Sequence, residues 1–196
     1  MSVPPTTIAS EGGIVLHDAE KDLLRRLQAG EPAAFDELVA DNRQRIARLV
    51  YRLLGWCGEV EDLVQDVLLV AYRKVGRFRG QSSLSTWLIG IAINRCRSYR
   101  RRWMPSWRWL ERLWRRRPPA PGPDRALMED ETAARVRKAV QELGESDREA
   151  IVLYYLEDLP AARIGQLLGI SAGAVDMRLH RARRRLREKL ADLGKE

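Results

Sequence analysis

The sequence predicts an all-α protein made of two small helical domains. Apolar residues recur at helical spacing through most of the chain, whereas strand-like alternation and hairpin turns are almost absent. The periodic segments lie on either side of Pro118–Pro123, a Pro-rich run that can neither continue a helix nor join a sheet. We therefore expect a disordered N-terminus over 1–17, domains over 18–102 and 124–193, and a flexible Pro/Arg/Trp-rich linker over 103–123.

Four helices are predicted in the first domain, over 18–29, 33–54 and 58–75 and from about residue 83 onward. Gly30 and Gly55 suit the ends of the first two, and Pro32 suits the start of the second. The third helix carries one continuous apolar stripe, which predicts a single buried face. Ser82 or Ser83 can cap the fourth.

Four more helices are predicted in the second domain, over 124–143, 146–157, 160–168 and 171–190. Ser146 is expected to cap the second of these, with Glu149 completing a capping box. A short helix, a turn containing Gly169, and a longer basic helix capped by Ser171 form a helix-turn-helix pattern. Gly165 would let the last two helices approach closely.

The charge of the chain predicts a polyanionic partner. Lys and Arg number 35 against 27 Asp and Glu, which gives a net charge of +8 and a pI near 10.0. Arg outnumbers Lys 30 to 5, and Arg suits bidentate contacts with phosphates and bases, although a GC-rich genome would produce the same bias. The positive charge gathers in 97–117 and 178–189, so we expect two separate contact sites.

Other classes of function find little support. The two cysteines, Cys57 and Cys96, form no CxxC pair, and the two histidines, His17 and His180, stand alone. No GxSxG, HExxH or P-loop motif occurs, so we expect a non-enzyme with no metal, cofactor or small-molecule substrate. The N-terminus lacks a signal-peptide pattern, and the longest apolar stretch, Trp87–Ile93, cannot span a bilayer, so a cytoplasmic protein is expected.

The last predicted helix offers a surface for duplex DNA. If it docks as helix-turn-helix proteins do, its first turns face the major groove. The candidate base readers are Arg178, His180 and Arg181, and the candidate phosphate contacts are Arg183, Arg184, Arg185 and Arg187. The alternative is a basic amphipathic helix without a partner.

The fourth and third helices carry two further unusual stripes. The fourth has a polar stripe in which small and amide side chains precede arginines: Thr86, Gly90, Asn94, Arg97 and Arg101. With Phe78 and the loop 79–82 beside it, an unstacked base would fit there. The third has Asp62, Gln65, Asp66 and Leu69 opposite its buried stripe, an apolar centre with a polar rim that is typical of protein contacts. A solvated face is the alternative for both stripes.

These residues together resemble a bacterial RNA polymerase sigma factor of the extracytoplasmic-function (ECF) group. The stretch Glu61–Leu68, then Ala71–Arg73, Arg77–Gly80, Ser83, Thr86–Leu88, Ile91, Ala92 and Asn94, is similar to region 2 of the family. Leu168–Ser171 with Gly173, Val175, Arg178–Arg183 and Leu186 is similar to region 4. The resemblance covers about 29–102 and 129–190.

The resemblance implies a function without chemistry, in which the protein makes core RNA polymerase specific for promoters. The polymerase-binding residues would be Asp62, Gln65, Asp66 and Leu69. The residues for the minus-10 element would be Phe78, Arg79, Ser83, Thr86, Trp87, Asn94, Arg97 and Arg101. Those for the minus-35 element would be Ser171, Ala174, Asp176, Met177, Arg178, His180, Arg181, Arg184 and Arg185. The implied partners are the β′ clamp helices and β flap of the polymerase, promoter DNA and an anti-sigma factor.

Two features depart from the family pattern. Asp176 and Met177 stand where a basic residue and a small polar residue are usual, so the common minus-35 sequence is not expected, although Asp176 can accept from a cytosine amino group. In the linker, Trp103, Trp107, Leu110 and Trp114 share one helical face among arginines. That face fits packing on the first domain, a protein partner such as the RNA exit channel or an anti-sigma factor, or a membrane surface.

Two other functions stay open at this point. A helix-turn-helix regulator that acts without core polymerase would use only the second domain and would give no role to Asp66 or Asn94. An adaptor for proteins or membranes would use the acidic third helix and the Trp/Arg segment, and it would have no effect on promoters.

Overall fold

A computed structural model of the protein describes residues 18–55, 59–114 and 131–191, and this part of the chain is helical without strands. The elements are α1 (Asp18–Gln28), α2 (Pro32–Leu54), α3 (Val60–Lys74), the 3-10 turn η1 (Val75–Arg77), α4 (Leu84–Trp114), α5 (Glu131–Gln141), α6 (Glu145–Ile151), the π-helical segment η3 (Val152–Leu156), α7 (Ala161–Leu168) and α8 (Ala172–Lys189). The all-α prediction is confirmed. The predicted N-terminal tail, 1–17, lies outside the described residues.

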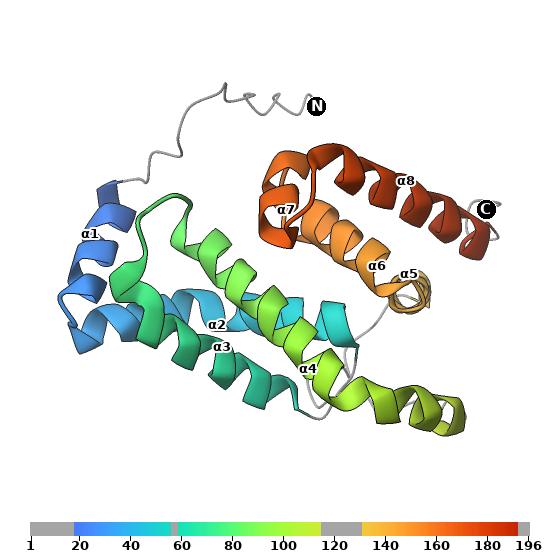
Figure 1. The fold of residues 1–196 in the computed structure, drawn as a ribbon, viewed down its shortest axis with the longest axis horizontal. Helices are drawn as coiled ribbons and strands as arrows, with labels where there is room; N and C mark the ends of the chain where they lie inside the picture. Colours follow the sequence, from blue (N-terminus) through green and yellow to red (C-terminus); the bar gives the residue numbers. More distant parts are fainter. Residues whose placement is uncertain (1–17, 56–58, 115–130, 192–196) are drawn as a thin grey trace.

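Helices α2, α3 and α4 pack side by side, and α1 crosses the N-terminal end of α2 (Figure 1). The apolar stripe predicted on the third helix is the buried face of α3, where Val64, Val67 and Ala71 are fully enclosed. Leu49 of α2 and Ala92 of α4 are enclosed against it. Burial of each large aliphatic side chain contributes about 1.5–3 kcal/mol, so this core fixes the three helices that carry both predicted stripes.

Helix α4 is longer than the sequence predicts for the first domain. It continues past the expected boundary at residue 102 to Trp114, into the segment expected to be the linker. The segment is mostly Arg, Trp and Leu, all of which a helix accommodates, and Pro105 does not interrupt it. In Figure 1 this end of α4 runs beyond the end of α2. Residues 115–123 of the predicted linker lie outside the described residues.

The helix-turn-helix forms as predicted from α7 and α8. Gly169 ends α7 with φ +70°, in the left-handed region that favours glycine, and the Ser171 hydroxyl caps α8 by accepting from the Ala174 N–H at 3.2 Å. A β-carbon at Gly165 would lie 2.7 Å from the Ile170 carbonyl oxygen. The close approach predicted at Gly165 is therefore confirmed.

The capping box predicted at Ser146 is wrong. Helix α6 begins at Glu145 after Gly144, and no side chain caps it. Glu149 does not turn back to the helix start, because its carboxylate pairs with arginines of α4 instead. The predicted helix 146–157 is α6 followed by the π-helical η3.

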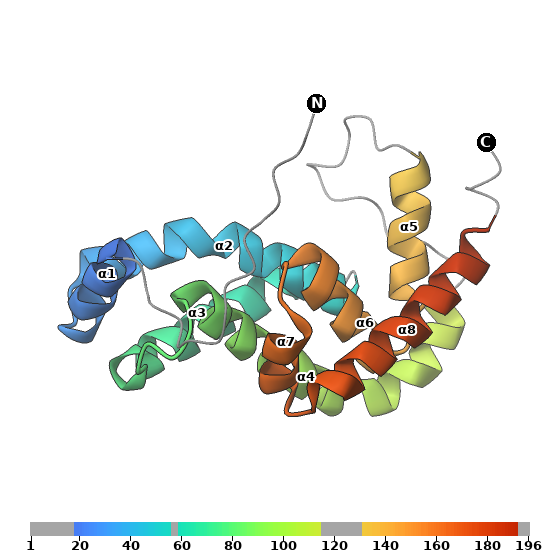
Figure 2. The same ribbon diagram turned by 90° about the horizontal axis from the view of Figure 1, so that it is seen from above.

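The two halves of the chain share one continuous apolar core. Helix α6 and η3 contact α2, and the α5 to α8 group lies against the α2 and α4 side of the first bundle (Figure 2). Buried side chains on both sides of this junction, such as Leu53 and Val152, belong to the same cluster. The structure thus gives the relative placement that the sequence alone does not predict.

Candidate polymerase and nucleic-acid interfaces

The exposed stripe of α3 lines a groove of about 720 Å³ between α2 and α3. Asp62, Gln65, Asp66 and Leu69 all line it, and all four are exposed. The groove therefore joins the predicted residues into one surface, lined by apolar side chains and by the carboxylates of Asp62 and Asp66. Such a surface fits a basic, amphipathic partner segment.

Sequence reasoning missed the aromatic part of this groove. Phe35 and Val39 of α2 and Tyr72 of α3 also line it. The rings of Phe35 and Tyr72 meet edge to face, with centroids 5.0 Å apart, and Tyr72 stays 60% exposed. The position of Tyr72, three residues after Leu69, was a usable signal, whereas no pattern links Phe35 of α2 with α3.

Helix α1 holds the loop that precedes α4. The Gln28 amide donates to the Phe78 carbonyl at 2.9 Å, and a Glu20 carboxylate oxygen accepts from the Leu84 N–H at 2.5 Å. Phe78 itself is 9% exposed and packs against Trp87, with ring centroids 5.0 Å apart. Phe78 is therefore part of the core beneath the loop, and its ring is not free to stack on a base.

Ser83 is the residue that caps α4. Its hydroxyl accepts from the Thr86 N–H at 3.1 Å and shares a second hydrogen bond with the Thr86 hydroxyl at 2.8 Å. Of the two caps that the sequence offered, Ser82 instead donates to the Ser83 carbonyl. Both Ser83 and Thr86 thus shape the first turn of α4, and Arg79 in the preceding loop is exposed.

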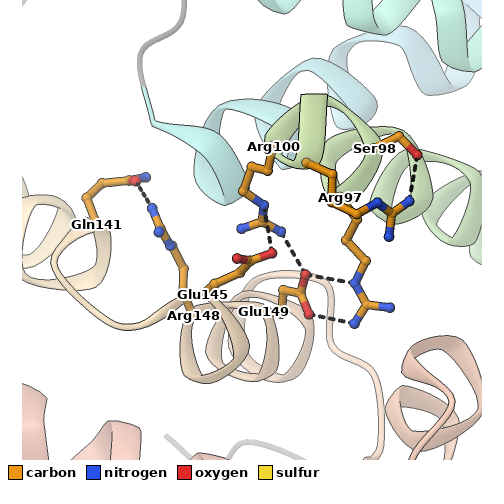
Figure 3. A network of polar contacts seen from close by, with 8 residues as sticks. Arg97, Ser98, Arg100, Gln141, Glu145, Arg148 and Glu149 are labelled. Atoms are coloured by element: carbon orange, nitrogen blue, oxygen red, sulfur yellow. Dashed lines mark hydrogen bonds and ion pairs between the residues drawn. The ribbon is translucent and has the colours of Figure 1, made fainter. Parts of the chain in front are cut away.

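The polar stripe of α4 is only partly open. Asn94 and Arg101 are exposed, as predicted. Arg97 is bound bidentately by Glu149 of α6, through Nε at 3.0 Å and Nη2 at 2.8 Å (Figure 3). These hydrogen bonds to Glu149 raise the pKa of Arg97 against the opposing effect of burial. Arg97 is therefore occupied by another part of the same chain.

The first turns of α8 present a mixed surface. Asp176, Met177, His180 and Arg184 are exposed, Met177 at 58%. Ala174 and Arg178 are half-buried beside them. Buried Val175 and Leu179 anchor the opposite face of α8, so the exposed set points away from the core.

Three arginines of α8 have partners on other elements of the second half of the chain. Arg181 and Arg185 each donate to the buried Asp147 carboxylate of α6 at 3.0 Å. Arg183 donates to the Tyr155 hydroxyl at 2.9 Å and lies over the Tyr154 ring. The predicted DNA contacts Arg181 and Arg185 thus have a structural role that sequence spacing does not reveal.

No group of three or more metal-ligating side chains occurs among the described residues. Within the same ranges, no helix is both long and apolar enough to cross a membrane.

Comparison with known proteins matches both halves to one family. The model of Sigma-70 region 2 matches residues 38–104, and that of Sigma-70 region 4 matches residues 133–186. The sequence is 30% identical over 183 residues to the ECF RNA polymerase sigma factor SigW of Bacillus subtilis, covering 88% of this chain and 97% of that protein. The chain belongs to the ECF RNA polymerase sigma factors. It is also 29% identical to the RNA polymerase sigma-H factor of Pseudomonas aeruginosa, over 93% of this chain and all of that protein.

Solved structures support the same assignment for this sigma factor. CnrH in complex with the cytosolic domain of CnrY aligns with a TM-score of 0.65 and 27% identity, over 89% of this chain and 99% of that one. RpoE of Bartonella quintana in complex with the anti-sigma factor NepR aligns with a TM-score of 0.60 and 25% identity, over 80% and 96% of the two chains. The α3 groove and α4 stripe lie within the match to region 2, and α8 lies largely within the match to region 4.

Proposed function

We propose that this sigma factor binds core RNA polymerase through the α2–α3 groove, at the β′ clamp helices. The groove carries this proposal, because a DNA-binding regulator acting alone has no use for it. Its apolar lining buries a partner's apolar side chains, and the carboxylates of Asp62 and Asp66 attract basic ones. Gln65, Leu69 and the aromatic pair Phe35 and Tyr72 complete the contact.

The same protein recognises the minus-10 element with the loop before α4 and the exposed part of its stripe. Arg79, Trp87 and Asn94 border this surface, while Ser83 and Thr86 fix its backbone. Unstacking a base costs a few kcal/mol, which contacts to the base and to backbone phosphates offset. Arg101 at the far end of the stripe is exposed and suited to a phosphate.

Helix α8 reads the minus-35 element in the major groove. Its first turns present Asp176, Met177 and His180 for base edges, and Arg178, with Arg184 further along the helix, is available for bases or phosphates. Ser171 at the cap and half-buried Ala174 lie at the end of α8 that enters the groove in helix-turn-helix proteins. A contact between this half of the chain and the β flap places α8 on the DNA upstream of the start site.

A further partner of this sigma factor is an anti-sigma factor. The solved structures of CnrH and RpoE that resemble this chain are complexes, with CnrY and with the anti-sigma factor NepR. The protein acts in the cytoplasm, where the polymerase is, and it carries no catalytic site of its own.

Run-off transcription from a pool of host promoter fragments tests the proposal. Purified core polymerase is combined with the wild-type protein, with Asp66→Arg, or with the matched control Asp41→Arg. Asp41 is exposed on α2 and does not line the groove. Discrete transcripts with the wild type and the control, lost with Asp66→Arg, support the proposal. A silent polymerase, with duplex DNA still bound by the protein alone, overturns it in favour of the regulator.

A further inference from the structure

A buried carboxylate of the second half holds two arginines of the first. The Glu149 side chain is 2% exposed and accepts from Arg97 through both of its oxygens and from Arg100 Nη2 at 2.8 Å (Figure 3). Arg100 Nε also pairs with Glu145 at 2.9 Å. Both arginines belong to α4 and both glutamates to α6, so the network crosses the junction between the halves.

A second buried carboxylate of the second half pairs in the same way with two arginines of α2. Glu157, whose side chain is also 2% exposed, pairs with Arg45 at 2.8 Å and with Arg52 at 3.5 Å. Nearby, the Gln141 amide donates to the Arg52 carbonyl at 3.0 Å, near the end of α2. We refer to Glu149, Glu157 and the four arginines that they bind as the clasp.

In the same closed arrangement, α7 lies over part of the surface proposed for the minus-10 element. Arg163 of α7 donates to the Gln81 carbonyl at 3.0 Å, in the loop before α4. A β-carbon at Gly90 would lie 3.2 Å from Cδ2 of Leu167. Gly90 is in the middle of the α4 stripe, so part of the face that would receive single-stranded DNA is covered by the protein's own helix.

A DNA phosphate can replace the clasp carboxylate as the partner of Arg97, because the ion pairs of the clasp contribute little net free energy. A buried ion pair gains Coulomb energy but costs desolvation of both charges, so its net contribution to stability is small. Removing one partner alone costs much more, because the other charge is then buried without a partner. Phosphate is an equally good bidentate acceptor for Arg97.

We propose that the clasp closes the free sigma factor, with Glu149 occupying the place of a promoter phosphate at Arg97, so that closure and minus-10 binding exclude each other. This inference rests on the proposed function for the meaning of the α4 stripe. The closure itself is a property of the free protein and is measured without polymerase.

The test compares the full-length wild type with Glu149→Gln/Glu157→Gln, which removes two negative charges at nearly constant volume. The matched control is Glu37→Gln/Glu61→Gln, which removes two negative charges from the exposed pairs with Arg26 and Arg43. Small-angle X-ray scattering gives the radius of gyration of each. Fluorescence anisotropy with a labelled single strand of about twelve mixed nucleotides gives the affinity for DNA.

We expect a larger radius of gyration and a tighter complex with the single strand for the clasp variant only. If closure leaves about a tenth of the free protein open, the dissociation constant falls about tenfold. An unchanged radius in the clasp variant overturns closure, and an opened variant without tighter binding overturns the competition with DNA.

Two controls keep the outcomes separate. Circular dichroism checks that the clasp variant retains its helices, and Glu149→Gln alone replaces it if helix is lost, with the same expected direction. Opening with tighter DNA binding, together with failed run-off transcription, would reject the proposed function and leave the closure in place. Normal transcription without opening would reject the clasp alone.

Discussion

The buried carboxylate of Asp147 on α6 accepts a hydrogen bond from Arg181 of α8 at 3.0 Å. Arg185 reaches the other oxygen of the same carboxylate at the same distance. The Asp147 side chain is 4% exposed, so burying its negative charge costs desolvation energy, which the two arginines offset. The pairing joins the recognition helix to the helix that supports it.

Arg181→Ala is therefore expected to reduce stability more than it changes base preference. Loss of one charged hydrogen bond to Asp147 lowers the free energy of unfolding by about 1–3 kcal/mol. Arg184→Ala is the control, because Arg184 is exposed and has only a 3.9 Å pair with Glu188. Its free energy of unfolding changes by less than about 0.5 kcal/mol, while affinity for promoter DNA falls.

Urea denaturation and DNA binding of both variants check this contrast. If Arg181→Ala leaves the midpoint of unfolding unchanged and alters the selected bases instead, Arg181 is a base reader, as its position in the sequence suggested.

Gly165 of α7 is expected to tolerate no side chain. Alanine would place a β-carbon 2.7 Å from the Ile170 carbonyl oxygen, which forces the two helices of the helix-turn-helix apart. We expect a loss of about 1–3 kcal/mol in the free energy of unfolding. Gly173→Ala on α8 is the matched control, since its added carbon would meet no atom within 4 Å beyond its chain neighbours and the backbone of its own helix.

Alanine has the better helix propensity, so Gly173→Ala is expected to raise stability by up to about 1 kcal/mol. Thermal denaturation of the two single variants measures the contrast. Equal melting temperatures would mean that the turn relaxes at Gly165 without cost.

Glu20 of α1 is expected to position the minus-10 loop. Its carboxylate accepts from the Leu84 N–H, a backbone donor at the start of α4 that has no partner within the helix. Glu20→Ala removes the acceptor, and we expect weaker promoter opening with unchanged binding of core polymerase. Glu20→Gln keeps an acceptor oxygen at nearly the same length and is expected to restore most of the activity.

Permanganate footprinting of the opened promoter measures opening, and size-exclusion chromatography with core polymerase measures assembly. If Glu20→Ala reduces assembly and opening equally, Glu20 serves general stability and does not position the loop.

The fold was largely predictable because helical periodicity and end signals are local. Ser171 caps α8 and Gly55 ends α2 as their neighbours in sequence suggest. The capping box at Ser146 failed because Glu149 has a stronger, distant option: the two arginines of α4, 49 and 52 residues away in the chain, outcompete a local backbone donor. Local patterns carry no record of such distant partners.

The same limit applies to the candidate surfaces. The stripe on α3 was predicted from spacing, and the structure shows Asp62, Gln65, Asp66 and Leu69 together in the groove. Phe35 was missed because it comes from another helix. Arg97 and Arg181 looked like equivalent solvent-facing cations, and only tertiary contacts reveal that buried carboxylates hold them.

Asp176 of α8 is expected to set an unusual minus-35 preference. It is exposed in the first turns of the recognition helix, beside Met177, and a carboxylate there accepts from the amino group of cytosine while repelling nearby phosphates. Asp176→Arg reverses this, because a guanidinium donates to guanine. We expect a change of preference at one base pair, worth about 1–3 kcal/mol of discrimination.

Selection from a pool of promoters with random minus-35 bases, bound by the polymerase holoenzyme, measures this preference. Glu188→Arg is the control, since it makes the same charge change near the far end of α8 and raises affinity for all sequences alike. A base profile that is identical for the wild type and Asp176→Arg would remove Asp176 from the reading surface. Met177, His180, Arg178 and Arg184 would then be the proposed side chains left to distinguish this promoter element from others.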